Sequence, residues 1–232
     1  MDSSSDVFEK GRVGLRERAR TRLTLQQRQK QDSRQRLVAA MREALLVMPY
    51  AAIAVEDIAA RAELSRVTFY KHFESKYQIG KVLHDQFRPL MFAQYRKFAE
   101  PGPPDLAGIV RWIDQLLDFY AQEKRLIIAF GQMMVVEPEF TPVVEQQSRD
   151  ILGSWADSIP SLAVMRQDTP AGAIARIDGR LILSQLNDFC YGLVVYEWRI
   201  DRRDGLHIMA RNLSRFISDQ AELTREQSPS LP

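Results

Sequence analysis

Residues 54–76 read AVEDIAARAELSRVTFYKHFESK and decide the fold of the N-terminal part of the chain. The stretch holds two short amphipathic segments, joined by a connection that is too short for a flexible loop. In the first segment Val55, Ile58 and Ala59 are spaced three and four residues apart, which places them on one face of a helix. Ser65 precedes the second segment, where its hydroxyl can accept hydrogen bonds from the unpaired amides of a first helical turn.

The second segment separates its apolar side chains from its polar ones. Leu64, Phe69 and Phe73 are expected to point inward. The residues expected to point outward are Arg66, Thr68, Lys71 and His72. A short helix that is anchored by aromatic side chains, with outward groups suited to base edges and phosphates, is typical of a helix-turn-helix. The sequence therefore predicts this motif over about residues 55–73.

Many positions at fixed spacing in this stretch also match a known family pattern. They are Asp57, Ile58, Ala59, Ala62, Leu64, Ser65, Thr68, Phe69, Tyr70, His72, Phe73, Ser75 and Lys76. With the flanking residues 50–83, the pattern resembles the DNA-binding signature of TetR/AcrR-type bacterial transcriptional regulators. The resemblance implies an all-α fold, with a three-helix helix-turn-helix DNA-binding domain over residues 34–83. It also implies that residues 84–232 form a helical bundle for effector binding and dimerisation.

Two positions depart from the usual TetR pattern. Ala54 stands where a Thr or Ser commonly caps the first of the two helices, and Glu63 stands where a small residue, often Gly, makes the turn. If the turn residue has a positive φ, a non-glycine residue there is strained by about 1 kcal/mol. These departures concern the detailed geometry of the turn and leave the assignment of the motif unchanged.

The charge is distributed unevenly along the chain, although the net charge of the 232 residues is only +2. The first 98 residues carry 19 Lys and Arg against 11 Asp and Glu, whereas residues 99–232 carry 13 against 19. The N-terminal part is therefore the part suited to a polyanion such as double-stranded DNA. Such a division favours a DNA-binding head joined to a body with another task.

Composition excludes several other classes of protein. A single cysteine, Cys190, excludes an internal disulfide and a cysteine metal cluster, and the three histidines are scattered, so we expect no metal site. The longest nearly apolar run, residues 126–136, is too short to cross a bilayer, and the N-terminus lacks the apolar stretch of a secretory signal. We expect a cytoplasmic, nucleoid-associated protein.

The N-terminal arm, residues 1–33, is rich in arginine and poor in acidic residues. Its basic residues from position 12 onward are Arg12, Arg16, Arg18, Arg20, Arg22, Arg28 and Lys30. One interpretation is that the arm adds phosphate or minor-groove contacts beside the second helix of the helix-turn-helix, the reading helix. The other is a solvated tail or a helical extension, because Leu15, Ala19 and Leu23 repeat every four residues without Gly or Pro.

Helical patterns account for the rest of the chain, and no period-two pattern predicts a strand. Before the helix-turn-helix, residues 35–48 read as a helix that ends at Pro49. After it, a helix from about residue 75 to residue 98 leads to PGPPD at residues 101–105, the clearest break in the chain. The helices expected beyond this break are Leu106–Ala121, Lys124–Val135, Thr141–Ser158, Ala173–Arg199 and Gly205–Gln220.

The candidate DNA contacts divide by role. The resemblance implies that Tyr70, His72 and Lys76 contact phosphates. Arg66 and Thr68 lie on the N-terminal part of the second helix and are the expected base readers, because Arg can bridge guanine O6 and N7 and the Thr methyl can meet a thymine methyl. Lys71 suits either role. The alternative is an ordinary solvated helix face.

The body is rich in aromatic residues, which fits a pocket for an apolar or aromatic effector. The candidate ligand-binding residues are Trp112, Phe119, Phe130, Met133, Trp155, Asn187 and Tyr191. For any one of them, plain core packing is the competing interpretation. Gln185, Asn187 and Asp188 interrupt an apolar helix, so they could orient a ligand or bond across a subunit interface.

A partner subunit is expected to cover the segment Ala173–Arg199, which is apolar nearly all round. In TetR-type proteins the final two long helices form a four-helix dimer interface, and the two last predicted helices resemble that pair. The candidate interface residues are Leu186, Leu193, Leu213 and Phe216.

No sequence motif supports catalysis or a bound cofactor. The chain has no Gly-x-Ser-x-Gly elbow, phosphate loop, dinucleotide fingerprint or His-Glu-x-x-His. We therefore expect a homodimeric repressor that a small apolar or aromatic effector releases from a palindromic operator, rather than an enzyme. The alternative is a DNA-binding protein of the same fold whose body binds a protein partner.

Overall fold

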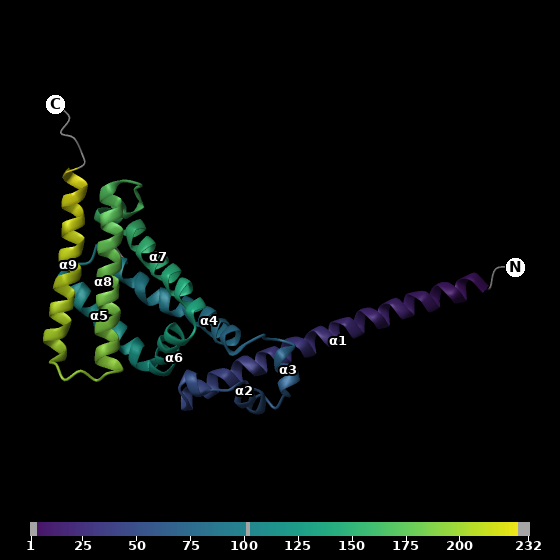
Figure 1. Ribbon diagram of the computed structural model, residues 1–232. Helices are drawn as coiled ribbons and strands as arrows, with labels where there is room; N and C mark the ends of the chain where they lie inside the picture. The colour runs from purple at the N-terminus through teal and green to yellow at the C-terminus, as the bar shows by residue number, and fades with distance from the viewer. Residues whose placement is uncertain (1–3, 101–102, 227–232) are drawn as a thin grey trace. The chain divides into compact units, whose positions relative to one another are not determined.

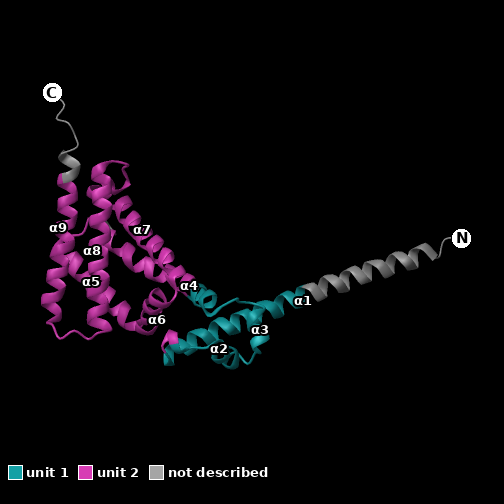
Figure 2. Cartoon of the chain, viewed as in Figure 1, with its two compact units in different colours: residues 1–48, 52–83 teal, residues 49–51, 84–232 magenta. Residues whose placement is uncertain are grey.

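The computed structural model describes residues 4–100 and 103–226, with side chains described for residues 24–100 and 103–222. The chain is 85% helical, and its described part contains no strand, so the predicted all-α class is confirmed. It divides into two compact units (Figure 2). Unit 1 comprises residues 1–48 and 52–83, and unit 2 comprises residues 49–51 and 84–232.

Unit 1 contains α1 (Ser4–Val47), α2 (Val55–Arg61), α3 (Arg66–Tyr70) and the first residues of α4 (Lys76–Arg96). The helix expected at residues 35–48 is the C-terminal part of the much longer α1. The side chains of the arginines from Arg12 to Arg22 lie outside the described residues. The core is made of side chains with no exposed surface: Leu37, Met41, Ile58, Phe69 and Ile79.

Unit 2 is a helical bundle built around the remainder of α4. Its long helices are α5 (Leu106–Gln122), α6 (Lys124–Val136), α7 (Thr141–Ser158), α8 (Pro170–Val194) and α9 (Arg202–Glu226). In the described part of the chain, the 3-10 segments between helices are η1 (Tyr50–Ala52), η2 (Lys97–Ala99), η3 (Pro138–Phe140) and η4 (Pro160–Arg166). Helices α8 and α9 run antiparallel side by side, and α5 packs against both (Figure 1).

Hydrogen bonds fix several helix ends in unit 2. Asp105 caps α5 by accepting from the Gly108 amide at 2.6 Å, and Thr169 caps α8 by accepting from the Gly172 amide at 3.1 Å. The Tyr50 amide donates to Gln132 Oε1 at 2.7 Å, and this bond anchors residues 49–51 within unit 2.

Helix α8 is shorter than the sequence pattern predicted. The expectation of a helix to Arg199 is wrong, because α8 ends at Val194. Beyond it Glu197 adopts a left-handed conformation with φ of 54°, and the Trp198 amide donates back to the Gly192 carbonyl at 3.1 Å. Residues 195–201 therefore form the connection to α9. Helix α4 continues through Pro89, which lies inside it.

Among the described residues, no single helix combines the length and apolar composition needed to cross a bilayer. Together, Lys124–Val136 and Pro138–Ser158 meet that test, but they meet at an angle of 115°.

Candidate nucleic-acid interface

Helices α2 and α3 form the predicted helix-turn-helix, and local hydrogen bonds define the start of α3. Ser65 has extended backbone angles and its Oγ accepts from the Thr68 amide at 3.0 Å, so the predicted N-cap is confirmed. Phe69 and Phe73 are 0% and 3% exposed, and their ring centroids lie 5.8 Å apart. These two aromatic side chains anchor the inner face of α3 and fix which residues face solvent.

The outward face of α3 carries most of the side chains expected to contact DNA. Arg66 and Lys71 are exposed, Tyr70 is 46% exposed, and Thr68 is half-buried. Val67 is 67% exposed between the two expected base readers, and the sequence analysis did not identify it. The helical periodicity does predict this exposure, because Phe69 points inward and the residues on the opposite face of α3 must point outward. An exposed Val can contact a thymine methyl.

Arg66 is held in place by groups on both helices. Its Nη1 lies 2.8 Å from Glu56 Oε1 of α2, and its guanidinium carbon lies 5.5 Å from the centre of the Tyr70 ring. The interaction with Tyr70, followed by the charge of Glu56, raises the pKa of Arg66. Since the pair is exposed, the guanidinium can exchange Glu56 for a base edge at small cost.

Basic residues of α1 surround His72. Its pKa is lowered from the ordinary value of 6.5, mainly by desolvation and then by the charges of Lys30, Arg34 and Lys71. Arg34 also lies over the Phe73 ring, 5.1 Å from its centre. The sequence analysis placed Lys30 in the arm and did not identify Arg34. Lys30 and Arg34 extend the basic surface of α3 onto α1, and only the packing of α1 shows this.

Lys76 is the first residue of α4 and is half-buried. Ser75 precedes it and accepts from the Gln78 amide at 3.3 Å. The N-terminal end of a helix of this length carries a partial positive charge, which suits a phosphate beside the ammonium group of Lys76.

The turn between the helices has the strained geometry that the sequence allowed. Glu63 has a φ of 53°, in the left-handed region that favours glycine. Arg36 of α1 donates to the Ala62 carbonyl at 2.6 Å and lies 3.3 Å from Glu63 Oε2. This side chain therefore satisfies the C-terminal end of α2 from outside the helix. At the other end of α2, Ala54 offers no cap, although its amide donates to Asp57 Oδ2 at 2.8 Å.

Comparison with known proteins agrees with this geometry. Residues 37–81 match the profile of the bacterial regulatory proteins of the tetR family, across the C-terminal part of α1, the helix-turn-helix and the start of α4. Residues 37–81 are therefore similar to the DNA-binding domain of tetR-family regulators. The HTH-type transcriptional repressor DhaR of Mycobacterium sp. (strain GP1) is 27% identical to it over 144 residues, which are 62% of this chain and 70% of that relative.

Solved structures extend the likeness to the whole TetR fold. A tetR-family transcriptional regulator from Streptomyces coelicolor superposes with a TM-score of 0.60 at 15% identity, over 84% of this chain and 85% of the other. A TetR-family regulator from Syntrophomonas wolfei gives 0.53 at 16% identity, over 87% and 99%. These similar proteins are transcriptional regulators, which agrees with the class expected from the sequence.

In unit 2, most of the residues expected to bind a ligand are packed in the core. Trp112, Phe119, Phe130, Met133 and Trp155 are at most 9% exposed. Both indole groups have backbone partners: Trp112 donates to the Gln94 carbonyl and Trp155 to the Tyr95 carbonyl, each at 2.9 Å.

Asn187 belongs to a buried polar cluster at the centre of unit 2. Its Oδ1 accepts from Tyr95 and, at 3.3 Å, from Tyr120, and the two tyrosine hydroxyls lie 3.0 Å apart. Burial raises the pKa of both tyrosines, so both hydroxyls remain protonated donors. Cys190 is fully buried beside them, and burial also raises the pKa of its thiol. Tyr191 is half-buried and faces Tyr196 with ring centres 5.2 Å apart.

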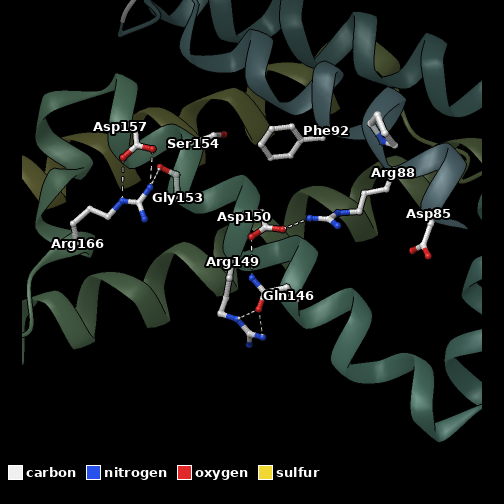
Figure 3. A pocket seen from close by; sticks show the side chains of 11 residues that line it. Asp85, Arg88, Phe92, Gln146, Arg149, Asp150, Gly153, Ser154, Asp157 and Arg166 are labelled. Atoms are coloured by element: carbon white, nitrogen blue, oxygen red, sulfur yellow. Dashed lines mark hydrogen bonds and ion pairs between the residues drawn. The ribbon is translucent and has the colours of Figure 1, made fainter. Parts of the chain in front are cut away.

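A cavity of about 670 Å³ lies instead between α4, α7 and the end of η4 (Figure 3). Its lining is strongly charged: Arg88 pairs with Asp150, and Arg166 makes two bonds to Asp157 at 2.7 and 3.1 Å. Phe92 supplies the large apolar surface. The sequence analysis identified none of these residues, because charged side chains at helical spacing read as solvated faces.

The residues expected at a dimer interface lie mostly inside one subunit. Leu186, Leu213 and Phe216 are 0%, 0% and 6% exposed, while Leu193 is half-buried. The apolar side chains that α8 and α9 leave exposed are different ones: Ile174, Ile177, Leu181 and Ile208, between 50% and 63% exposed. Within the described residues no group of three or more His, Cys, Asp or Glu is placed to hold a metal ion.

Proposed function

We propose that this chain is a TetR-family transcriptional repressor that binds a palindromic operator as a homodimer and leaves it when a small effector occupies the body. The observation that carries the proposal is α3 itself. Buried Phe69 and Phe73 fix one face of the helix, and the other face presents Arg66, Val67 and Tyr70 to solvent. This arrangement suits insertion into a major groove, with base edges read by the first turn of the helix.

The roles of individual side chains follow from their positions. Arg66, Val67 and Thr68 would read bases, and Tyr70, His72 and Lys76 would hold phosphates, with Lys71 able to do either. Lys30 and Arg34 would extend the phosphate contacts along α1, and this supports a DNA-binding role for at least the C-terminal end of the 1–33 arm.

The decisive test is footprinting on the DNA that flanks the encoding gene, followed by affinity measurements on the protected site and on random DNA. Replacing Lys76 with Ala should weaken binding to the protected site and to random DNA by a similar factor, and should lower the salt dependence of binding by about one counterion. Replacing Arg66 with Ala should weaken the specific site more than random DNA. Equal losses on both for Arg66 would show that it does not read bases.

The dimer would form through α8 and α9. On α8, the exposed side chains of Ile174, Ile177 and Leu181 lie on one face, at the three- and four-residue spacing of a helix that packs against a partner. In an isolated protein such a stripe would be solvated at a cost in free energy, so a second copy of the same pair is the natural cover. Sedimentation of the Leu181→Glu variant, compared with the parent chain, tests this interface. Leu46→Glu, at an exposed position of α1, is the control.

The effector would bind in the body rather than among the core residues first considered. The aromatic residues of the core are already packed against one another, with Phe98 and Trp155 ring centres 4.5 Å apart. Open cavities lie along α7 in unit 2, so an effector can enter one of them without displacing the core. Because the relative DhaR is a repressor, release on effector binding is the mode we propose for this chain, in a cytoplasmic, nucleoid-associated setting.

A further inference from the structure

A second cavity, of about 500 Å³, lies on unit 2 between α7, η4 and α8. Its floor is apolar, because Leu152, Ala156 and Met165 line it and are 8%, 4% and 6% exposed. A hollow of this size falls in the range of small-molecule sites, and its floor suits the apolar part of a ligand.

Four arginines surround this floor: Arg149, Arg166, Arg176 and Arg180, with Glu145 as the acidic residue of the lining. Arg166 is neutralised, since Asp157 takes two of its hydrogen bonds and the Gly153 carbonyl takes another at 2.8 Å (Figure 3). The charges that matter for a ligand are therefore those of the other three arginines.

The other three arginines bond only to uncharged groups. Arg149 donates to Gln146 Oε1 at 2.8 and 3.1 Å, and Arg180 lies 3.3 Å from the hydroxyls of Ser148 and Ser184. In the part of the chain that the structure describes, no carboxylate oxygen lies within 4.0 Å of these two or of Arg176.

Arg176 has a structural task of its own. It donates to the backbone carbonyls of Met165 at 3.0 Å and Gln167 at 2.8 Å, and so it holds the end of η4 against α8. Arg149 and Arg180 bond to side chains and not to the backbone, so these two guanidinium groups can turn toward a ligand by exchanging those partners. With one Glu against three unneutralised arginines, the cavity carries an excess of positive charge above an apolar floor.

We propose that this cavity binds an amphipathic anion, with a carboxylate or phosphate held by Arg149 and Arg180 and an apolar part laid on Leu152, Ala156 and Met165. Guanidinium groups match the geometry of carboxylate and phosphate oxygens and can bind either with two parallel hydrogen bonds. The role of this anion as the effector rests on the proposed function. The binding site itself is argued only from the charges and the cavity.

Calorimetric titration of the full-length protein with octanoate, octyl phosphate and octan-1-ol tests the site, below the concentrations at which these compounds aggregate. The three compounds share the apolar chain and differ in the head group. We expect saturable binding of at least one anion, about tenfold or more tighter than that of the alcohol. The stronger of the two anions identifies the head group as carboxylate or phosphate.

The double variant Arg149→Gln/Arg180→Gln should lose that tenfold preference, and Arg149→Lys/Arg180→Lys should retain part of it. Arg125→Gln, an exposed arginine on α6, is the matched control and should bind as the parent does. Equal binding of anion and alcohol, or an unchanged preference in the Gln variant, overturns the proposal. Loss of the native circular dichroism or of the dimer in the ligand-free Gln variant also overturns it, because the arginines would then be structural or interfacial.

Measurement of DNA binding with the same compounds separates this site from the proposed function. If the anion binds and releases the operator fragment, both proposals are supported. If the anion binds while the operator affinity stays unchanged, the anion site is supported and its role as the effector site is refuted. If the protein binds no DNA in the absence of any ligand, the proposed function fails, and the titration still decides the anion site.

Discussion

Replacing Ala54 with Ser should stabilise unit 1, because α2 is the one helix of the DNA-binding motif that begins without a side-chain cap. Ala54 already has the extended backbone of an N-cap, with φ of −95° and ψ of 161°, and its amide already donates to Asp57 Oδ2. Only the reciprocal bond, from the Asp57 amide to an oxygen at position 54, is missing. A serine hydroxyl supplies that oxygen and completes a capping box without moving the backbone.

The expected gain is about 1 kcal/mol, the typical value of an N-cap side chain. With a urea dependence of about 2 kcal/mol per molar, it corresponds to a midpoint shift of about 0.5 M. All three tryptophans lie in unit 2, so far-ultraviolet circular dichroism must report the unfolding of unit 1, and tryptophan emission reports unit 2. The midpoint by circular dichroism should rise in the Ala54→Ser variant.

Ala60→Ser provides a control of opposite sign, because the same substitution within α2, at an exposed position, costs about 0.5 kcal/mol in helix propensity. Asp57→Ala should reduce stability in both the parent and the Ala54→Ser backgrounds, since its carboxylate bonds the position-54 amide in each. An Ala54→Ser midpoint at or below that of the parent would refute the reasoning that α2 lacks a cap.

Four further outcomes follow from the same geometry. Glu63→Gly should relieve about 1 kcal/mol of left-handed strain and raise the urea midpoint, whereas Glu63→Ala, which keeps a Cβ at a φ of 53°, should not. Glu56→Gln should tighten operator binding roughly two- to fivefold by freeing Arg66 and removing a negative charge, and an unchanged affinity would mean that the pair does not restrain Arg66. The pKa of His72 is below 6.5 in the folded chain, so the unfolded state binds more protons at a pH between the folded and the unfolded pKa. The free energy of unfolding should therefore fall as the pH drops below 6.5. The His72→Gln variant should make the urea midpoint less dependent on pH in that range. Leu181→Glu should lower the sedimenting mass from that of the proposed dimer to that of a monomer and weaken operator binding, whereas Leu46→Glu should leave the sedimenting mass unchanged.

The sequence predicted the helix-turn-helix well because its determinants are local. The position of Ser65 before the second helix and the inward spacing of Phe69 and Phe73 depend on residues within one or two turns, and both are confirmed. The surroundings of His72 depend instead on where α1 packs. For that reason Arg34 could not be linked to the reading helix from the pattern alone.

In unit 2, the sequence pattern could not predict which subunit covers each apolar residue. Apolar spacing in α8 and α9 predicted burial correctly, but it cannot distinguish burial within one subunit from burial by a partner. Leu186 and Leu213 are covered by the same chain, whereas Ile177 and Leu181 are exposed in it. Arginines such as Arg149 and Arg180 have the spacing of a solvated face, and only the fold brings them together above an apolar hollow.

The unusual residues at both ends of α2 make this helix depend on α1. A helix of seven residues does not hold together by itself, and here its first turn lacks a cap and its last residues lead into a strained turn. Its stability comes from burial of Ile58 and Ala59 and from Arg36, which reaches from α1 to the Ala62 carbonyl and to Glu63. Since α2 supports α3 through the turn, the orientation of the reading helix is fixed partly by a side chain that need not touch DNA. Loss of Arg36 should therefore weaken binding to specific and random DNA through disorder of α2, and a completed cap at position 54 should offset part of that loss.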